Sequence, residues 1–159
     1  MSFVNYTSIV EGWLPLDAGT ALYNDAMKCP KDLYIVEIGS FKGLSTCYLS
    51  NGSKDGNCSK VFAIDPHCGN IEHKIDGQPI STFDEYYNNL TKHGFNNYVT
   101  TIKDYSYNVV DQFEDNSIGV LFIDGSHEYE DVKNDFLLYY PKVNSGGVIP
   151  MHDCCVGVS

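Results

Sequence analysis

Three acidic residues, Glu37, Asp65 and Asp124, stand at or next to the ends of short apolar runs in this chain. Runs of this kind are typical of strands that are buried on both faces of a parallel sheet. Because the carboxyl ends of parallel strands meet at one edge of the sheet, we expect the three carboxylates to lie near one another. Carboxylates gathered there favour a ligand with a cationic amine or sulfonium group and disfavour a pyrophosphate.

Two glycines, Gly39 and Gly43, follow Glu37 and free the backbone for a sharp turn and for the close approach of a ligand. A phosphate-binding loop would need Lys and then Ser or Thr directly after the second glycine, but Leu44 stands there. The dinucleotide fingerprint G-x-G-x-x-G needs a third glycine that this loop lacks. The remaining pattern, E-x-G-x-x-x-G, resembles the first motif of class I S-adenosylmethionine-dependent methyltransferases.

The ends of the next two apolar runs supply candidate contacts for a nucleoside. Asp65 ends the run KVFAID about 20 residues beyond the glycine loop, where a carboxylate can accept hydrogen bonds from both hydroxyls of a ribose. The pair Asp65-Pro66 is also a common way to end a strand, and this alternative remains open. Asp104, Tyr105 and Ser106 follow the run YVTTIK and are placed to meet an adenine.

His127 follows Asp124 by three residues, so its imidazole can overhang a cleft at the strand ends. An imidazole titrates near neutral pH, which makes His127 our candidate for a general base. Two structural roles compete with this one, because His127 can cap its own helix or pair with Glu130.

The elements that position these residues alternate along the chain. We expect strands at 33–38, 60–65, 98–103, 118–124 and 147–151, with a turn at 144–147 before the last strand. We expect helices at 17–29, 44–50, 82–93, 105–114 and 128–140, the second ended by Asn51 and Gly52 and the third opened by a capping box, Thr82-x-x-Glu85. Together they predict a doubly wound, Rossmann-like α/β sheet of strand order 3-2-1-4-5 with helices on both faces.

Size and composition indicate one domain over residues 1–159, which is large enough to bury a core. The formal net charge of −11 disfavours nucleic acid and anionic membrane surfaces as partners. No apolar run reaches the length of a membrane span and the N-terminus does not resemble a signal peptide, so we expect a cytoplasmic protein. The six cysteines show no C-x-x-C spacing and so do not indicate a zinc site.

Three stretches in order, VEIGSFKGLST, VFAIDPH and LFIDGSHEYEDVKNDFLLYYPKVNSGGVIPMHD, resemble a small O-methyltransferase-like branch of the class I methyltransferases. That branch is grouped with macrocin-type sugar O-methyltransferases and cephalosporin hydroxylase-like proteins. The resemblance implies that Glu37, Gly39 and Gly43 cradle the methionine part of S-adenosylmethionine and that Asp65 holds its ribose. It further implies cofactor contacts from the loop, the strand ends and the helix start, namely Ser40, Phe41, Ser45, Pro66, Asp104, Tyr105 and Asp124.

The resemblance also implies a divalent metal, Mg²⁺ or Mn²⁺, with Asp124, His152 and Asp153 as its ligands. The imidazole suits Mn²⁺, Fe²⁺ or Zn²⁺ better than Mg²⁺, which prefers an all-oxygen shell. Alternatively, His152 and Asp153 end the last strand and hydrogen-bond the substrate.

These features predict methyl transfer from S-adenosylmethionine to a hydroxyl of a sugar or another hydroxylated metabolite, with Asp124 and His127 as catalytic residues. A metal-dependent hydroxylase on the same fold and a catalytically inactive binding domain are the alternatives. Methyltransferases of this class usually add a sixth and a seventh strand, which we expect to be missing here. An uncovered fifth strand would allow a homo-oligomer to form.

Overall fold

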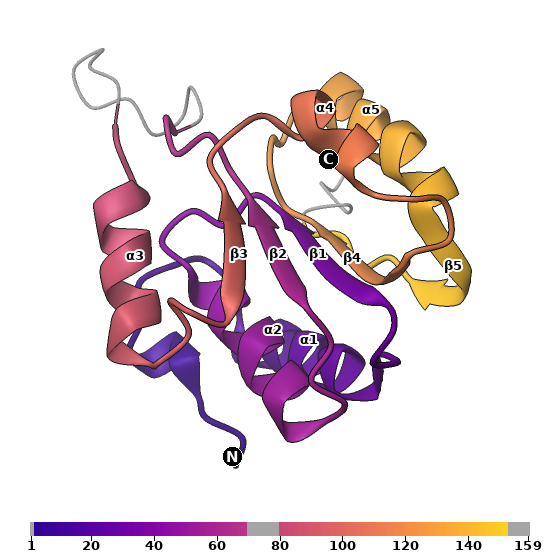
Figure 1. The fold of residues 1–159 in the computed structure, drawn as a ribbon. Helices are drawn as coiled ribbons and strands as arrows, with labels where there is room; N and C mark the ends of the chain where they lie inside the picture. The colour runs from indigo at the N-terminus through magenta and orange to yellow at the C-terminus, as the bar shows by residue number, and fades with distance from the viewer. Residues whose placement is uncertain (1, 70–79, 153–159) are drawn as a thin grey trace, which may run out of the picture.

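Residues 2–69 and 80–152 are described by the computed structural model, and they form a single five-stranded sheet (Figure 1). The strand order is β3-β2-β1-β4-β5 and every neighbouring pair is parallel, which confirms the predicted order and fold class. The strands are β1 (Tyr34–Ile38), β2 (Val61–Ile64), β3 (Val99–Ile102), β4 (Ile118–Ile123) and β5 (Val143–Val148). All of the expected strands are therefore present, each within a few residues of its predicted place.

Helices connect successive strands, as right-handed crossovers in a parallel sheet require. The α-helices are α1 (Leu16–Lys28), α2 (Leu44–Asp55), α3 (Phe83–Lys92), α4 (Ser106–Val109) and α5 (Tyr129–Tyr139). Within the described part of the chain, short 3-10 helices accompany them: η1 (Tyr6–Ser8), η3 (Val110–Gln112) and η4 (Tyr140–Lys142).

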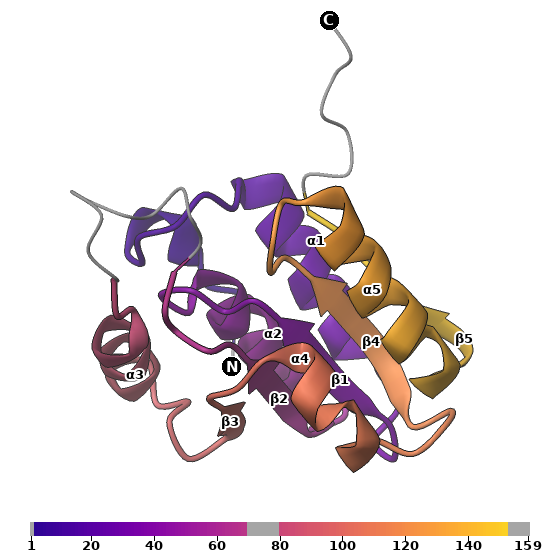
Figure 2. The ribbon, with the colours of Figure 1, turned by 90° about the horizontal axis from the view of Figure 1, so that it is seen from above.

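Two apolar cores lie on opposite faces of the sheet, and the helices divide between them (Figures 1 and 2). One core joins α1, α2 and α3 to residues such as Ile35 and Val61, while the other joins α4, α5 and η3 to Val36 and Leu121. Alternate residues of β1 thus face alternate cores, and β4 is buried along its whole length. Because helices cover both faces of the sheet, a ligand can approach it at the carboxyl ends of the strands.

Helix α2 continues to Asp55, so the predicted stop at Asn51 and Gly52 is wrong. Gly52 lies inside the helix because α1 passes close to it: a Cβ at position 52 would lie 2.2 Å from the carbonyl oxygen of Tyr23. The glycine therefore serves helix packing, and the helix ends at Gly56 instead.

The predicted turn at 144–147 lies within β5 instead of before it. Ile118 pairs with Val143 and Val120 pairs with Val148, so β5 bulges between its two contacts with β4. Gly146 has a φ of 90°, which allows the bulge. Beyond the end of β5, Met151 forms an isolated bridge to Ile123 and places His152 beside the end of β4.

Candidate active site

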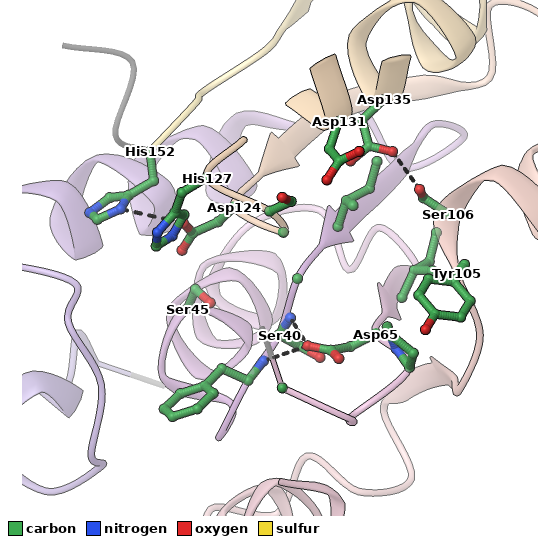
Figure 3. Close-up of a pocket in the computed structure, with 18 of the residues that line it drawn as sticks. Ser40, Ser45, Asp65, Tyr105, Ser106, Asp124, His127, Asp131, Asp135 and His152 are labelled. Carbon is green, nitrogen blue, oxygen red and sulfur yellow. Dashed lines mark hydrogen bonds and ion pairs between the residues drawn. The ribbon is translucent and has the colours of Figure 1, made fainter. Parts of the chain in front are cut away.

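A cavity of about 990 Å³ opens at the carboxyl ends of β1, β2 and β4 (Figure 3). Its volume lies at the upper end of the range for small-molecule sites in proteins. Ten of the residues predicted as site residues line it: Gly39, Ser40, Phe41, Ser45, Asp65, Pro66, Tyr105, Asp124, His127 and His152. Of the others, Glu37, Gly43 and Asp104 are not among the described residues of its wall, and Asp153 lies outside the described residues.

The glycine loop is held tightly between β1 and β4. Gly39 has a φ of 87°, and a Cβ there would lie only 2.2 Å from the carbonyl oxygen of Asp124. The backbone amide of Asp124 donates to the carbonyl of Ile38 at 2.8 Å. Gly43, with a φ of 88°, is the N-cap of α2. Only glycine fits position 39, and the cavity floor is consequently bare backbone.

Asp65 organises this loop through both of its carboxylate oxygens. Its Oδ2 accepts hydrogen bonds from the backbone amides of Ser40 and Phe41, each at 2.8 Å (Figure 3). Its Oδ1 accepts one from the amide of His67 at 2.6 Å. A carboxylate offers about four lone-pair directions, so these three bonds leave one for a ligand. The carboxylate thus joins the ends of β1 and β2 before any ligand is bound.

His67 holds Asp65 through its backbone amide. The sequence analysis did not identify His67 as a site residue. Its ring is almost fully buried, and its Nδ1 lies 2.9 Å from the hydroxyl of Thr82. The predicted capping box is therefore wrong, because Thr82 makes no side-chain cap of α3 and pairs with His67 instead. Burial lowers the pKa of His67, which favours the neutral imidazole.

Glu37 lies beneath the loop and is fully buried. Its Oε2 accepts a hydrogen bond from Thr46 at 2.5 Å, while Oε1 has no hydrogen-bond partner among the described residues. Burial raises the pKa of Glu37 to about 8, and the nearby hydroxyls of Ser45 and Thr46 oppose this only in part. The carboxyl group of Glu37 thus supports the glycine loop in its protonated form, and the loop separates this group from the cavity.

Asp124, His127 and His152 meet at one end of the cavity (Figure 3). His152 Nδ1 lies 3.3 Å from Asp124 Oδ1, and about a fifth of each side chain is exposed. His127 extends from the β4–α5 turn beside them and is exposed. This end of the cavity can exchange protons with a bound hydroxyl group.

The same pair, Asp124 and His152, supplies an oxygen and a nitrogen that suit a divalent metal. The third predicted ligand, Asp153, lies outside the described residues, and within 2–69 and 80–152 no cluster of three such side chains forms a metal site. Two of three predicted ligands are thus adjacent.

The opposite end of the cavity is formed by the start of α4 and by one face of α5 (Figure 3). Tyr105 stacks on Tyr107 with ring centroids 5.3 Å apart, and Ser106 donates a hydrogen bond to Asp135. Asp104 instead accepts hydrogen bonds from the amide of Tyr105 at 2.7 Å and from Asn108 at 2.8 Å. Its carboxylate is engaged next to the start of α4 and is not among the described residues of the cavity wall.

Helix α5 contributes four cavity residues that the sequence analysis missed: Asp131, Asn134, Asp135 and Leu138. Their spacing of three or four residues marks one face of a helix, and this was the signal that could have found them. Asp135 is only 8% exposed, and burial raises the pKa of its carboxyl group.

At the mouth of the cavity an N-terminal segment lies across the glycine loop. Trp13 stacks on Phe41 with centroids 5.2 Å apart and an interplanar angle of 20°. Lys42 joins this segment to α3 through ion pairs with Glu11 at 2.9 Å and Glu85 at 2.7 Å. Lys42 is only 14% exposed, but Glu11 and Glu85 are 74% and 56% exposed, so solvent and salt screen these pairs in part.

Acidic groups dominate the electrostatics of the cavity. Five carboxylates line it, and the described part of its wall contains no lysine or arginine. They are Asp65, Asp124, Glu128, Asp131 and Asp135. The cavity is therefore suited to cationic or neutral ligands and unsuited to polyanions.

A parallel sheet of order 3-2-1-4-5, with a glycine loop after β1 and carboxylates at the ends of β1, β2 and β4, defines a class I methyltransferase fold. A family model described as a methyltransferase domain matches residues 36–154, from β1 to beyond the end of β5. The chain belongs to this methyltransferase domain family.

A similar sequence occurs in a virus. An uncharacterized protein of Acanthamoeba polyphaga mimivirus is 40% identical over 130 residues, which cover 77% of this chain and 52% of that protein. This chain therefore spans about half the length of that relative.

Two solved structures share the fold. A Corynebacterium glutamicum protein matches with a TM-score of 0.69 at 18% identity, covering 89% of this chain and 60% of that one. A Bacillus cereus O-methyltransferase in complex with S-adenosylhomocysteine matches with a TM-score of 0.64 at 17% identity, covering 91% and 60%. Among the described residues, none of the helices has the length and apolar character needed to cross a lipid bilayer.

Proposed function

We propose that this domain binds S-adenosylmethionine and transfers its methyl group to a hydroxyl of a small molecule, such as a sugar or another hydroxylated metabolite. One observation carries the proposal: a single cavity joins the Asp65-bound glycine loop to the cluster of Asp124, His127 and His152. A cofactor seat and a proton-accepting group therefore face the same space.

The cofactor seat follows from the backbone of the loop and the end of β2. With no side chain at Gly39, the methionine part can lie against the loop, and its carboxylate can approach the amino end of α2 near Ser45. Asp65 has one lone-pair direction left, so it accepts one ribose hydroxyl while it holds the loop, and not both hydroxyls as the sequence pattern predicted. Tyr105 then borders the adenine.

The acceptor enters beside Asp124, His127 and His152. Because the described wall carries five carboxylates and no lysine or arginine, an acceptor bearing a diphosphate or a coenzyme A group would meet repulsion along its length. The acceptor we propose is accordingly neutral or cationic, and an aminosugar or a polyol fits this condition.

In the proposed reaction the imidazole of His127 accepts the proton of the acceptor hydroxyl. The hydroxyl oxygen then forms a bond to the methyl carbon while the carbon–sulfur bond breaks, and the electron pair of that bond remains on the sulfur as a neutral thioether. Asp124 holds His152 in place at 3.3 Å, and both side chains position the acceptor. The products are the methyl ether, S-adenosylhomocysteine and one proton.

Bound S-adenosylmethionine supplies the activated methyl group on a positively charged sulfur. Should a divalent metal be present, Asp124 and His152 would hold it, and it would polarise the acceptor hydroxyl. Mn²⁺ suits the carboxylate and imidazole pair better than Mg²⁺.

Calorimetric titration with S-adenosylmethionine and S-adenosylhomocysteine, with and without Mg²⁺ or Mn²⁺, tests cofactor binding. We expect the wild type to bind both and Asp65→Asn to bind each at least tenfold more weakly. Asp111→Asn, a matched change on the exposed surface of η3, keeps the wild-type affinity. If the wild type binds neither compound under any condition, the proposal is wrong.

Transfer itself is tested by incubating the protein with methyl-labelled cofactor and a metabolite extract and then measuring product mass. We expect a labelled ether from the wild type and a large loss of product from His127→Gln, which should bind the cofactor normally. Cofactor binding without product in any extract would favour the inactive binding domain, and an oxygenated product would favour the hydroxylase.

A further inference from the structure

We propose that Asp135, fixed by Ser106, reads the 6-amino group of the purine and so makes the cavity selective for adenosyl over deaminated nucleosides. This inference rests on the proposed function, because it assigns a specificity residue to the cofactor seat. It also relocates a role that the sequence pattern gave to Asp104.

The position of Asp135 in the cavity supports this assignment. Asp135 lies on α5, is 8% exposed, and forms part of the cavity wall. One oxygen accepts the hydrogen bond from Ser106, while Oδ2 points toward the β4–α5 turn, 3.8 Å from where a Cβ on Gly125 would lie. A buried carboxylate in a cavity wall costs free energy unless donors reach it, and a ligand N–H group would meet this need.

The element that fixes Asp135 is itself well held. The hydroxyl of Tyr139, which is buried one turn further along α5, donates to the backbone carbonyl of Ser106 at 2.9 Å. Ser106 therefore binds α5 through its hydroxyl and through its carbonyl, and the start of α4 is tied to the helix that carries Asp135. The carboxylate is pre-positioned before a ligand arrives.

The position of Ser106 and Asp135 along the cavity indicates which part of the ligand these two residues contact. Asp65 marks the ribose position, and Tyr105 and Ser106 follow at the end of β3, away from the cluster of Asp124 and His127 (Figure 3). A base attached to a ribose at Asp65 extends toward Ser106 and Asp135. The 6-amino group of adenine carries two N–H donors, whereas hypoxanthine carries an oxygen there that a carboxylate repels.

Other carboxylates at this end fit the role less well. Asp104 precedes α4, and its carboxylate accepts hydrogen bonds from Tyr105 and Asn108. Asp131 lies one turn before Asp135 and lines the cavity, but its side chain is exposed, so its hydrogen bonds compete with water. Of the described carboxylates at this end of the cavity, Asp135 is the one that combines burial, a hydrogen bond that fixes it and a place in the wall.

Calorimetric competition between S-adenosylhomocysteine and S-inosylhomocysteine tests the inference, since the inosyl compound carries an oxygen in place of the 6-amino group and a hydrogen on the neighbouring N1. We expect the wild type to prefer the adenosyl compound by about tenfold or more. Asp135→Asn should reduce this preference below about threefold, because an amide can donate to the oxygen as well as accept from the amine. Asp104→Asn and Asp131→Asn should keep the wild-type preference.

Ser106→Ala serves as a second variant if Asp135→Asn does not fold, and thermal unfolding monitors both. Without the serine hydroxyl the carboxylate loses its fixed orientation, and the preference should fall severalfold while the protein remains folded. Equal affinity of the wild type for both compounds, or an unchanged preference in folded Asp135→Asn or Ser106→Ala, would overturn this inference and leave methyl transfer intact. Failure of the wild type to bind either compound would overturn the proposed function as well.

Discussion

The buried carboxyl group of Glu37 makes the stability of this domain depend on pH in an unusual direction. Its side chain is fully buried, and burial raises its pKa from 4.5 to about 8. Between these values the folded protein retains a proton that the unfolded chain has already released. Raising the pH through this range therefore lowers the free energy of unfolding. Glu37→Gln has no proton to lose at this position and lacks this contribution.

The size of the effect follows from the shift. A change from 4.5 to about 8, at about 1.36 kcal/mol per pH unit, gives on the order of 5 kcal/mol as the full contribution. Whole domains have unfolding free energies of about 5–15 kcal/mol, so ionising this one carboxyl group removes a large fraction of the total. The contribution is fully present below pH 4.5 and is lost as the pH rises toward 8.

Urea unfolding followed by circular dichroism at pH 5, 6, 7 and 8 measures this contribution as a difference between the wild type and Glu37→Gln. Other groups also depend on pH: burial lowers the pKa of His67 and of His93, which gives the opposite sign. These groups are shared by both proteins, so the difference isolates Glu37. Glutamine can still accept the hydrogen bond from Thr46.

We expect the wild type to lose several kcal/mol relative to Glu37→Gln between pH 5 and pH 8, with a slope of at most about 1.4 kcal/mol per pH unit. Two stability curves that run parallel within about 1 kcal/mol over this range would refute the reasoning, because Glu37 would then ionise alike in the folded and unfolded states.

Three further predictions concern backbone packing and the mouth of the cavity. Gly39→Ala should destabilise the fold by about 2–4 kcal/mol in urea unfolding, because its Cβ meets Asp124 at a φ that disfavours alanine; a neutral result would contradict the close approach. Gly52→Ala should also destabilise the fold, by about 1–3 kcal/mol, because the added Cβ meets the carbonyl of Tyr23. Helix propensity alone predicts the opposite, a gain of about 1 kcal/mol, so the sign of the change in thermal unfolding decides between the two. Lys42→Met should speed limited proteolysis of the N-terminal segment and cost about 1 kcal/mol at low salt, and the difference from the wild type should shrink in 1 M NaCl; a difference independent of salt would argue against the ion pairs.

The sheet and its open edge could be predicted from the sequence because strong physical constraints determine them. Apolar runs such as those before Asp65 and Asp124 suit only strands covered on both faces, and parallel strands bring their carboxyl ends together. The glycine loop was also predictable, since Gly39 lies where side chains of L-residues are excluded.

Side-chain directions at the same edge could not be predicted from the same information. Asp104 and Asp135 are both acidic residues near the edge, but which of them faces the cavity depends on local competition for hydrogen bonds. Asp104 precedes a helix start, where a short acidic side chain captures backbone and side-chain donors nearby. Asp135 gains its role from the packing of α5 against α4, a tertiary contact between residues 29 positions apart.

Glycine signals misled where tertiary packing decided the outcome. Gly52 reads as a helix stop in the sequence, but close contact with α1 retains it inside α2. Residues 144–147 read as a turn because they are polar and rich in glycine, yet they form a bulge that stays within β5. Local propensity is weak compared with the pairing of a strand at the edge of a sheet.

The position of Trp13 has a practical consequence. It is the only tryptophan in the chain, it is 68% exposed, and it rests on Phe41 at the rim of the cavity. A molecule that binds against Phe41 changes the surroundings of this indole, and we expect the wavelength or intensity of its emission to change with it. The protein therefore carries its own optical reporter of occupancy, and libraries of adenosyl compounds and acceptors can be screened without a label.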